Sequence, residues 1–314
     1  MRAGGIPMLK LIAAWILALL VLIGGAVIAL AAPAMHEPGW TIAPFVTLPS
    51  TRAEDPEVDG AGNLYVACGQ DGVFRVTPTG SVSLWSAAQG YGIAMLPSGQ
   101  AYLPSRDIFT TKYLWDIQSD GSYSALVTGA SPSWLYCAAS PSGLLYANVI
   151  GTGKGIYMVD RQTGSSTPVL IGGPGPGGVG TYSDMATTSD NTLYVSGALA
   201  PGIGIFRILG GVSAQVIPLP IEMIGLCRGP SDTLFGATYQ GSGPTTDGQA
   251  WRLNVDAGAG TVFASGFGVS DGIAYAPTLD RFYVIDLGGQ VWKITHDSTP
   301  AMNTTWGGVK SKYR

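Results

Sequence analysis

The sequence predicts an all-β protein: a six-bladed β-propeller of four-stranded antiparallel blades, preceded by one transmembrane α-helix. A four-residue strand pattern with an aromatic at its second position recurs six times, with the aromatics 41 to 49 residues apart. Glycine accounts for 46 of the 314 residues and charged residues for only 11%, a composition typical of short strands joined by tight turns. A run of 22 uncharged residues near the N-terminus predicts the helix.

The uncharged run covers residues 11–32. At about 1.5 Å per residue it spans roughly 33 Å, slightly more than the hydrocarbon core of a bilayer. Arg2 and Lys10 precede it, so the positive-inside rule predicts a short cytoplasmic N-terminus, residues 1–10, and a propeller on the periplasmic or extracellular side. We expect an uncleaved signal-anchor. A cleaved signal peptide is the alternative, because Ala29-Leu30-Ala31 has the small-residue pattern of a cleavage site.

A linker, residues 33–40, is expected to lead into the propeller, residues 41–306, which a basic C-terminal tail, residues 307–314, follows. The repeated strand reads apolar, aromatic, variable, apolar, as in Val73-Phe74-Arg75-Val76. A second apolar strand precedes it, as at Leu64-Tyr65, and further strands upstream and downstream complete a set of four. The other aromatics of the pattern are Trp115, Tyr157, Phe206, Trp251 and Trp292. Four strands in every ~40–50 residues are the signature of a propeller blade.

Both faces of a blade pack against neighbouring blades, so its strands should be continuously apolar rather than alternating. The ring must also close, because open first and last blades would expose apolar faces and strand edges. Residues 41–48, which precede the first blade, are therefore expected to supply the outer strand of the sixth.

Residues 53–80 (AEDPEVDGAGNLYVACGQDGVFRVTPTG) resemble the calcium-dependent lactonase family of senescence marker protein 30 and gluconolactonase. They are also similar to strictosidine synthase-like propellers, some of which carry an N-terminal membrane anchor. The resemblance extends over about residues 50–295 and implies a central tunnel. In the lactonases one residue at the start of each innermost strand points into it, and a Glu, an Asn and an Asp there hold a divalent metal. Counting back from each aromatic places that position at Glu54, Tyr91, Ser133, Ser183, Ile224 and Asp271.

The match to the family's metal ligands is partial. Glu54-Asp55-Pro56 is similar to its Glu-Gly-Pro, and Asp271 stands in a segment similar to its Pro-Asp-Gly motif. Tyr91, Ser133 and Ser183 replace its asparagines. Because Ca²⁺ takes six to eight oxygen ligands, Glu54 and Asp271 with serine hydroxyls and water could hold Ca²⁺ only weakly. No other cofactor is expected.

Catalytic candidates are few. Glu54 and Asp271 are the candidate catalytic carboxylates, since a neighbouring charge can raise the pKa of one of them; alternatively both only cap turns. The two histidines, His36 and His296, stand beside the apolar run and after the last blade, which argues against a Ser-His-Asp arrangement. The candidate ligand contacts at the tunnel mouth are Tyr91, Ser133, Trp134, Ser183 and Asp184.

The function we expect is that of a binding or scaffold subunit within a larger membrane protein complex. The anchor, the missing asparagines and the scarcity of charges favour it, because a charge-poor exterior suits a stable protein interface. The expected partners are the lipid bilayer and integral-membrane proteins; a net charge of −4 gives no sign of nucleic-acid binding. The alternative is an anchored metal-dependent lactonase or esterase-like hydrolase. A small-ligand sensor that uses Tyr91 and Trp134 is the third hypothesis.

Overall fold

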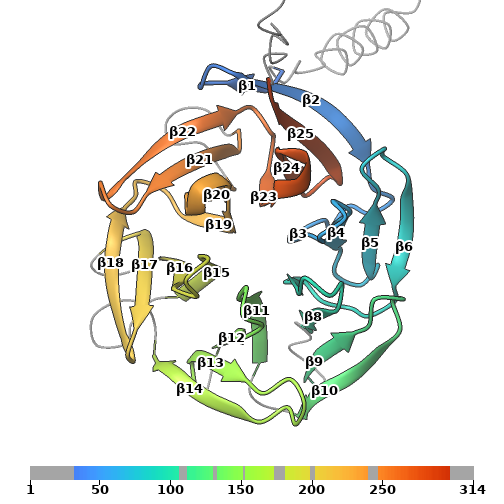
Figure 1. Ribbon diagram of the computed structural model, residues 1–314, viewed down its shortest axis with the longest axis vertical. Helices are drawn as coiled ribbons and strands as arrows, with labels where there is room; N and C mark the ends of the chain where they lie inside the picture. Colours follow the sequence, from blue (N-terminus) through green and yellow to red (C-terminus); the bar gives the residue numbers. More distant parts are fainter. Residues whose placement is uncertain are drawn as a thin grey trace, which may run out of the picture. The chain divides into compact units, whose positions relative to one another are not determined.

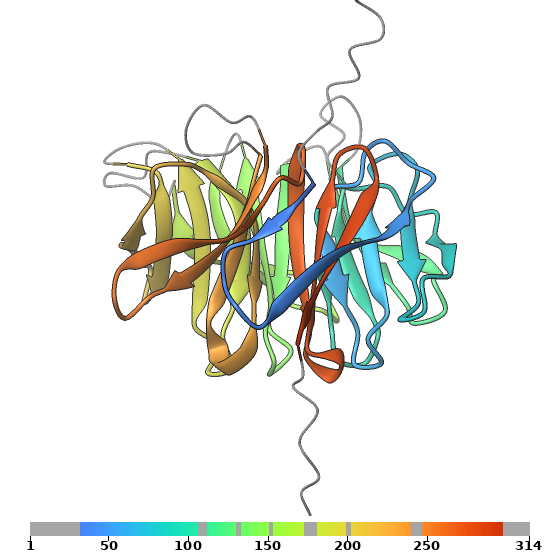
Figure 2. The same ribbon diagram turned by 90° about the horizontal axis from the view of Figure 1, so that it is seen from above.

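The computed structural model describes residues 32–105, 112–129, 133–150, 153–172, 181–198, 202–239 and 247–297. From residue 33 onward they form a ring of six β-sheets, seen along its axis in Figure 1 and from the side in Figure 2. The predicted six-bladed, all-β propeller is confirmed. Apart from Ala32, the predicted membrane segment lies outside the described residues, as does the basic tail. Within the described ranges, no helix is long and apolar enough to cross a membrane.

Each blade is an antiparallel sheet built outward from the ring axis. The innermost strands are β3 (Pro56–Val58), β7 (Ala94–Met95), β11 (Ser133–Ala139), β15 (Thr181–Thr187), β19 (Met223–Arg228) and β23 (Ser270–Ala276). The second strands are β4 (Leu64–Ala67), β8 (Ala101–Pro104), β12 (Leu145–Ile150), β16 (Leu193–Ala198), β20 (Leu234–Thr238) and β24 (Arg281–Asp286). The third strands are β5 (Val73–Val76), β9 (Lys112–Ile117), β13 (Gly155–Val159), β17 (Gly204–Leu209), β21 (Gln249–Asn254) and β25 (Gln290–His296). The outer strands are β6 (Val82–Ser86), β10 (Tyr123–Gly129), β14 (Ser166–Ile171), β18 (Val212–Pro218), β22 (Ala259–Ser265) and β2 (Trp40–Thr47).

The repeat in the sequence corresponds to the blades. All six pattern aromatics lie in third strands, and the first pattern, Val73–Val76, is the whole of β5. The expected continuous burial is also found, because every residue of β4, β8 and β20 is buried. Strands buried on both faces explain how an all-β chain reaches 46% hydrophobic residues.

The ring is closed by its N-terminal strand, as predicted. β2 pairs with β25 from Trp40 opposite His296 to Thr47 opposite Gln290, with a register shift between Pro44 and Val46. The segment expected to be a linker contains a further strand, β1 (Ala34–Met35), which pairs with β22 as the fifth strand of blade five. The N-terminal stretch therefore contributes to two blades, five and six.

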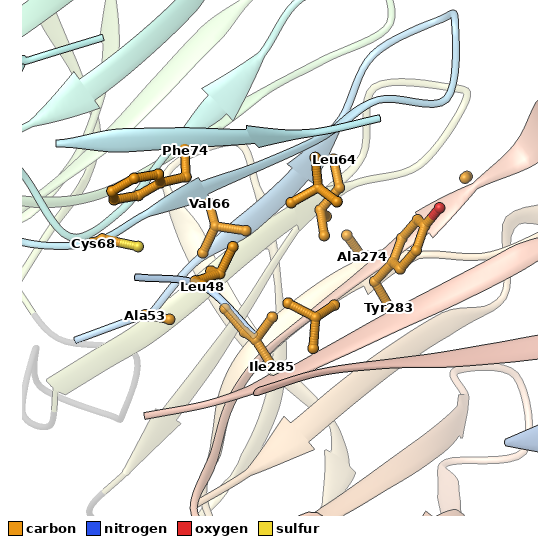
Figure 3. Close-up of a cluster of buried hydrophobic side chains, with 12 residues drawn as sticks. Leu48, Ala53, Leu64, Val66, Cys68, Phe74, Ala274, Tyr283 and Ile285 are labelled. Atoms are coloured by element: carbon orange, nitrogen blue, oxygen red, sulfur yellow. The ribbon is translucent and has the colours of Figure 1, made fainter. Parts of the chain in front are cut away.

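The core is divided into six clusters of buried apolar side chains, one at each junction between blades. Figure 3 shows the cluster at the closing junction, where Leu64 and Val66 of blade one meet Tyr283 and Ile285 of blade six. Burying one such aliphatic or aromatic side chain contributes about 1.5–3 kcal/mol. The closing junction therefore contains a buried apolar cluster, as the other five junctions do.

A glycine allows the outer parts of blades one and two to meet. Gly121, in the turn between β9 and β10, has a φ of +86°, a conformation that L side chains rarely adopt. A Cβ at this position would also collide with the carbonyl oxygen of Trp85 in β6. Both the backbone conformation and the contact with the preceding blade therefore require glycine here.

Candidate functional site

Four of the innermost strands, β11, β15, β19 and β23, contain a β-bulge. In β15 Tyr182 pairs with Gly197 and Asp184 with Ser196, which leaves Ser183 as an extra residue. Ile224 in β19 and Asp271 in β23 are extra residues in the same way. A bulge interrupts pairing and redirects a side chain. Three of the positions counted from the aromatics, Ser183, Ile224 and Asp271, are therefore bulge residues.

In blade three the bulge does not include the counted position, Ser133. Ser133 is the first residue of β11 and pairs with Ile150, whereas Leu135 and Tyr136 together stand opposite Asn148. The buried Asn148 accepts a hydrogen bond from the backbone N–H of Tyr136 through its side-chain oxygen, at 2.7 Å. Ser133 is therefore a regularly paired residue, while the bulge contains Tyr136.

Two other predicted ligand contacts, Trp134 and Tyr91, pack against protein. Trp134 is only 2% exposed and lies in the core between blades two and three, with its ring 6.1 Å from that of Tyr157. It is a core residue and not a tunnel-mouth contact. The half-buried ring of Tyr91 lies against Gly69 of blade one, where an added Cβ would approach its Cε1 to 3.0 Å. Ser183 is buried and donates a hydrogen bond to Glu222 of blade five.

The backbone segments that carry the two predicted carboxylates lie side by side. Gly272, next to Asp271, packs so closely on blade one that a Cβ there would collide with the carbonyl oxygen of Glu54. Glu54 and Asp271 therefore belong to one region at the junction of blades six and one. Among the described residues, no group of three or more His, Cys, Asp or Glu side chains is arranged to hold a metal ion. Calcium binding by this pair stays a prediction.

Two aspartates hold neighbouring innermost strands together. Asp55 Oδ2 accepts a hydrogen bond from the backbone N–H of Ile93 in the next blade, at 2.7 Å. Asp184 does the same between blades four and five, because its Oδ2 accepts from the N–H of Leu226 at 2.6 Å. Its other oxygen, Oδ1, accepts from the N–H of Met185 at 2.7 Å. Asp184, predicted as a ligand contact, therefore has a structural role that Asp55 shares.

These aspartates lie within a concentration of negative charge at the ring axis. Burial raises the pKa of Asp55 well above its usual range, and the charges of Asp184, Glu57 and Asp271 raise it further, against the bond from Ile93. Burial likewise raises the pKa of Asp184, with Glu57 and Asp271 adding to the effect. The pKa of the Tyr136 hydroxyl is raised by burial first and then by Asp271 and Asp184. Carboxylates from blades one, four and six thus act on one another across the axis.

Both histidines are on the outside of the ring. His36 Nε2 is 2.8 Å from the hydroxyl oxygen of Ser265 in the outer strand β22, and His296 Nδ1 is 3.2 Å from Asp280 Oδ2. Neither histidine reaches the axial carboxylates, so the expectation that the chain lacks a Ser-His-Asp arrangement holds for the described residues.

A cavity of about 750 Å³ opens at the mouth where the innermost strands end and turn into the second strands. We call it the turn-side cavity. All six blades contribute to its wall, each through the end of its innermost strand or the following turn. One residue from each blade in order is Glu57, Met95, Ala138, Met185, Leu226 and Tyr275.

The wall of the turn-side cavity contains a half-buried carboxylate, Glu57, and a guanidinium, Arg228. Glu57, in β3, is half-buried, and burial raises its pKa to about 7, against a hydrogen bond from Val58 and the positive charge of Arg228. Arg228 ends β19, and its Nη1 is 3.7 Å from Asp232 Oδ1. Sequence reasoning missed Glu57, although a carboxylate inside an innermost strand of a chain with 11% charged residues is a usable signal.

We expect the stability of the fold to depend on the protonation of Glu57. Since the pKa of Glu57 is higher in the folded protein than its ordinary value of 4.5, its contribution is fully present below pH 4.5 and is lost as the pH rises through about 7. Across this window the wild type should lose about 1–3 kcal/mol relative to Glu57→Gln. Urea unfolding of both proteins from pH 4.5 to 8 measures the difference. Asp55 and Asp184 are present in both proteins, and part of the difference comes from loss of the Glu57 charge that raises the pKa of each. A difference that does not change with pH would contradict the prediction.

No protein-family model and no curated protein matches the chain, whereas many solved structures share its fold. A gluconolactonase from Xanthomonas campestris aligns with a TM-score of 0.66 at 14% identity, covering 84% of this chain and 94% of that chain. The PQQ-bound aldose sugar dehydrogenase of Streptomyces coelicolor aligns with 0.60 at 14% identity, covering 84% and 99%. An auxiliary nutrient binding protein from Bacteroides thetaiotaomicron aligns with 0.62 at 13% identity, covering 82% and 77%. At such identities the likeness shows the fold alone.

Proposed function

We propose that this chain is a membrane-tethered, extracytoplasmic propeller that acts as a scaffold subunit and docks a protein partner on blades three and four. The observation that carries the proposal is a group of three exposed apolar side chains on these blades. Ile171, Leu209 and Val212 are 62%, 69% and 65% exposed, more than any other large hydrophobic residue in the described part of the chain. We call them the rim patch.

The rim patch joins two neighbouring segments. Leu209 and Val212 pair across the turn between β17 and β18. This turn packs on β14 of the preceding blade, because a Cβ on Gly211 would lie 3.7 Å from the carbonyl oxygen of Val169, two residues before Ile171. Three such side chains would contribute roughly 4–9 kcal/mol on burial, before the cost of association is subtracted. Clustered exposed apolar residues of this kind mark interfaces in soluble domains.

The tether in this proposal is the uncharged run of residues 11–32. A partner that is itself an integral membrane protein fits best, because confinement to one membrane raises the effective concentration of each for the other. Charge-poor surfaces are also easier to desolvate, and only 11% of the chain is charged.

Mild detergent extraction from the native membrane, followed by size and mass analysis, tests this function. We expect the chain to migrate in a defined multi-subunit complex with residues 1–32 intact. The double variant Leu209→Lys, Val212→Lys should be released from the complex. The control Leu84→Lys changes a residue that is 56% exposed on blade one and should remain bound. A chain that runs alone, or one that has lost its first ~32 residues, would contradict the proposal, as would equal behaviour of the two variants.

An anchored hydrolase is the second candidate, and one observation favours it: the fold shared with a gluconolactonase, combined with the adjacency of the segments that carry Glu54 and Asp271. In this alternative the two carboxylates would hold Ca²⁺ and activate water. Calcium-dependent hydrolysis of gluconolactone that Glu54→Gln abolishes, with the fold intact, would support it. The rim-patch variant leaves these carboxylates unchanged, so the two candidates are tested separately.

A further inference from the structure

The turn-side cavity has no part in the proposed scaffold function, yet its wall combines apolar side chains with charged ones. Small-molecule sites are concave, mostly apolar and carry a few polar groups that fix orientation. Met95, Met185 and Leu226 line this cavity with apolar surface, and Tyr275 adds an aromatic ring. Methionine side chains adapt to different shapes, and a volume of about 750 Å³ accommodates a molecule of substantial size.

Two of the three carboxylates in the wall, those of Asp59 and Asp232, already accept hydrogen bonds from neighbouring protein groups. Asp59 accepts four hydrogen bonds, from the N–H of Ala61, the N–H and side-chain amide of Asn63, and the hydroxyl of Tyr65. Asp232 accepts from the backbone N–H and the hydroxyl of Ser189 and pairs with Arg228. These contacts fix both aspartates in the turns of blades one and five.

Glu57, unlike Asp232, takes part in none of the three ion pairs found among the described residues. It is a half-buried residue of the cavity wall. Glu57 lies close enough to Asp55 and Asp184 for its charge to raise the pKa of each, and neither aspartate has a cationic partner in those ion pairs. A carboxylate in such surroundings is stabilised by an opposite charge that arrives with a ligand.

The charge balance of the cavity favours a cation. Its wall holds three carboxylates and one guanidinium, and that guanidinium, on Arg228, is already paired with Asp232. The Arg228 side chain is also 38% exposed, so water screens its charge more than it screens that of Glu57. An anion that approaches Arg228 would be repelled by the remaining carboxylates, whereas a cation would be attracted by all three.

We propose that the turn-side cavity binds a small organic cation, an amine whose ammonium group pairs with Glu57 and whose apolar body lies against Met95, Met185 and Leu226. The cavity and its apolar wall provide burial, and Glu57 provides the counter-ion. The class of ligand is therefore a monoamine with a hydrophobic body rather than a metal ion or a carboxylic acid.

Fluorescence titration with three matched probes tests the proposal on the full chain at pH 8, where Glu57 is ionised. The probes are dansylcadaverine, which carries a primary amine, dansyl-6-aminohexanoate, which carries a carboxylate, and dansyl-butylamide, which is neutral. We expect dansylcadaverine to bind at least about tenfold more tightly than the other two, the effect of one charge-assisted hydrogen bond. Glu57→Gln should remove this preference, while the control Arg228→Gln should keep it or increase it.

Three results would overturn the proposal. One is the absence of dansylcadaverine binding at millimolar concentration. Another is equal binding of all three probes, unchanged in Glu57→Gln, which would indicate apolar adsorption only. The third is tightest binding of the carboxylate with loss in Arg228→Gln, which would assign the cavity to anions. Because Glu57→Gln replaces a half-buried carboxyl with a group of the same shape, urea unfolding at pH 8 should show that this variant is at least as stable as the wild type.

Discussion

Replacing Phe282 with alanine is expected to destabilise the folded protein by about 3–5 kcal/mol, the range measured for truncating a large buried aromatic. Phe282 is 0% exposed in β24 and lies at the centre of the junction between blades five and six. Its ring centroid is 4.4 Å from that of Phe235 and 5.4 Å from that of Phe263. Its ring centroid is also 5.5 Å from that of Trp40 in the closing strand β2. Truncation of this one side chain therefore removes aromatic contacts with three other strands, including the strand that closes the ring.

The free energy of unfolding in urea, at constant pH, measures this effect. Phe282→Leu is the matched control, because it keeps most of the buried volume and loses only the aromatic contacts; it should cost clearly less than Phe282→Ala. Outer-rim positions provide a second comparison, since Leu84→Ala changes an exposed side chain and should have almost no effect. A loss below about 1 kcal/mol in Phe282→Ala would mean that this junction is not packed as described.

Replacing Gly272 with alanine should produce the second large effect, a loss of about 1–3 kcal/mol or more from overpacking at the closing junction. Its added Cβ would collide with the ring of Pro56 and with the carbonyl oxygen of Glu54. Gly272 also lies against blade five, because a Cβ on Gly225 would come within 2.8 Å of its Cα. Backbone atoms on both sides leave little room for relaxation, so β23 would have to move away from blade one.

Gly60→Ala is the control for this substitution. Gly60 is exposed in the turn after β3, and the nearest atom to an added Cβ is the carbonyl oxygen of Pro97 at 4.0 Å. Since alanine restricts the unfolded chain, this variant should be neutral or up to about 1 kcal/mol more stable. Opposite signs for the two glycine variants in urea unfolding would confirm that close approach, rather than loss of glycine itself, is responsible. Equal effects would contradict this explanation.

The fold could be predicted in detail because the same packing of one blade against the next recurs six times. Every third strand contributes an aromatic to the space between blades, so the period of the aromatics is the period of the architecture. The closing strand was predictable for a related reason, since the last blade would otherwise lack its outer strand. The two-residue strand β1 was not, because a pairing this short leaves no pattern in the sequence.

The tunnel positions counted from the aromatics coincide with β-bulges in three blades, at Ser183, Ile224 and Asp271. In blade three the bulge lies at Leu135 and Tyr136, while Ser133 pairs with Ile150. A bulge inserts one residue without changing the apolar character of a strand, so a pattern of residue types does not reveal it.

The amino-acid pattern was enough to predict the ring: the number of blades, the four-stranded plan of each and the strand that closes it. Which polar side chains lie near one another could be seen only in the folded chain. Asp55 and Asp184 are 129 positions apart in the chain, yet the charge of Asp184 raises the pKa of Asp55. Each also accepts a hydrogen bond from a backbone N–H of the next blade. The apolar periodicity reflects contacts between adjacent blades, and these contacts recur in every blade. The turn-side cavity is instead lined by one short segment from each of the six blades, and the polar residues of these segments follow no repeat.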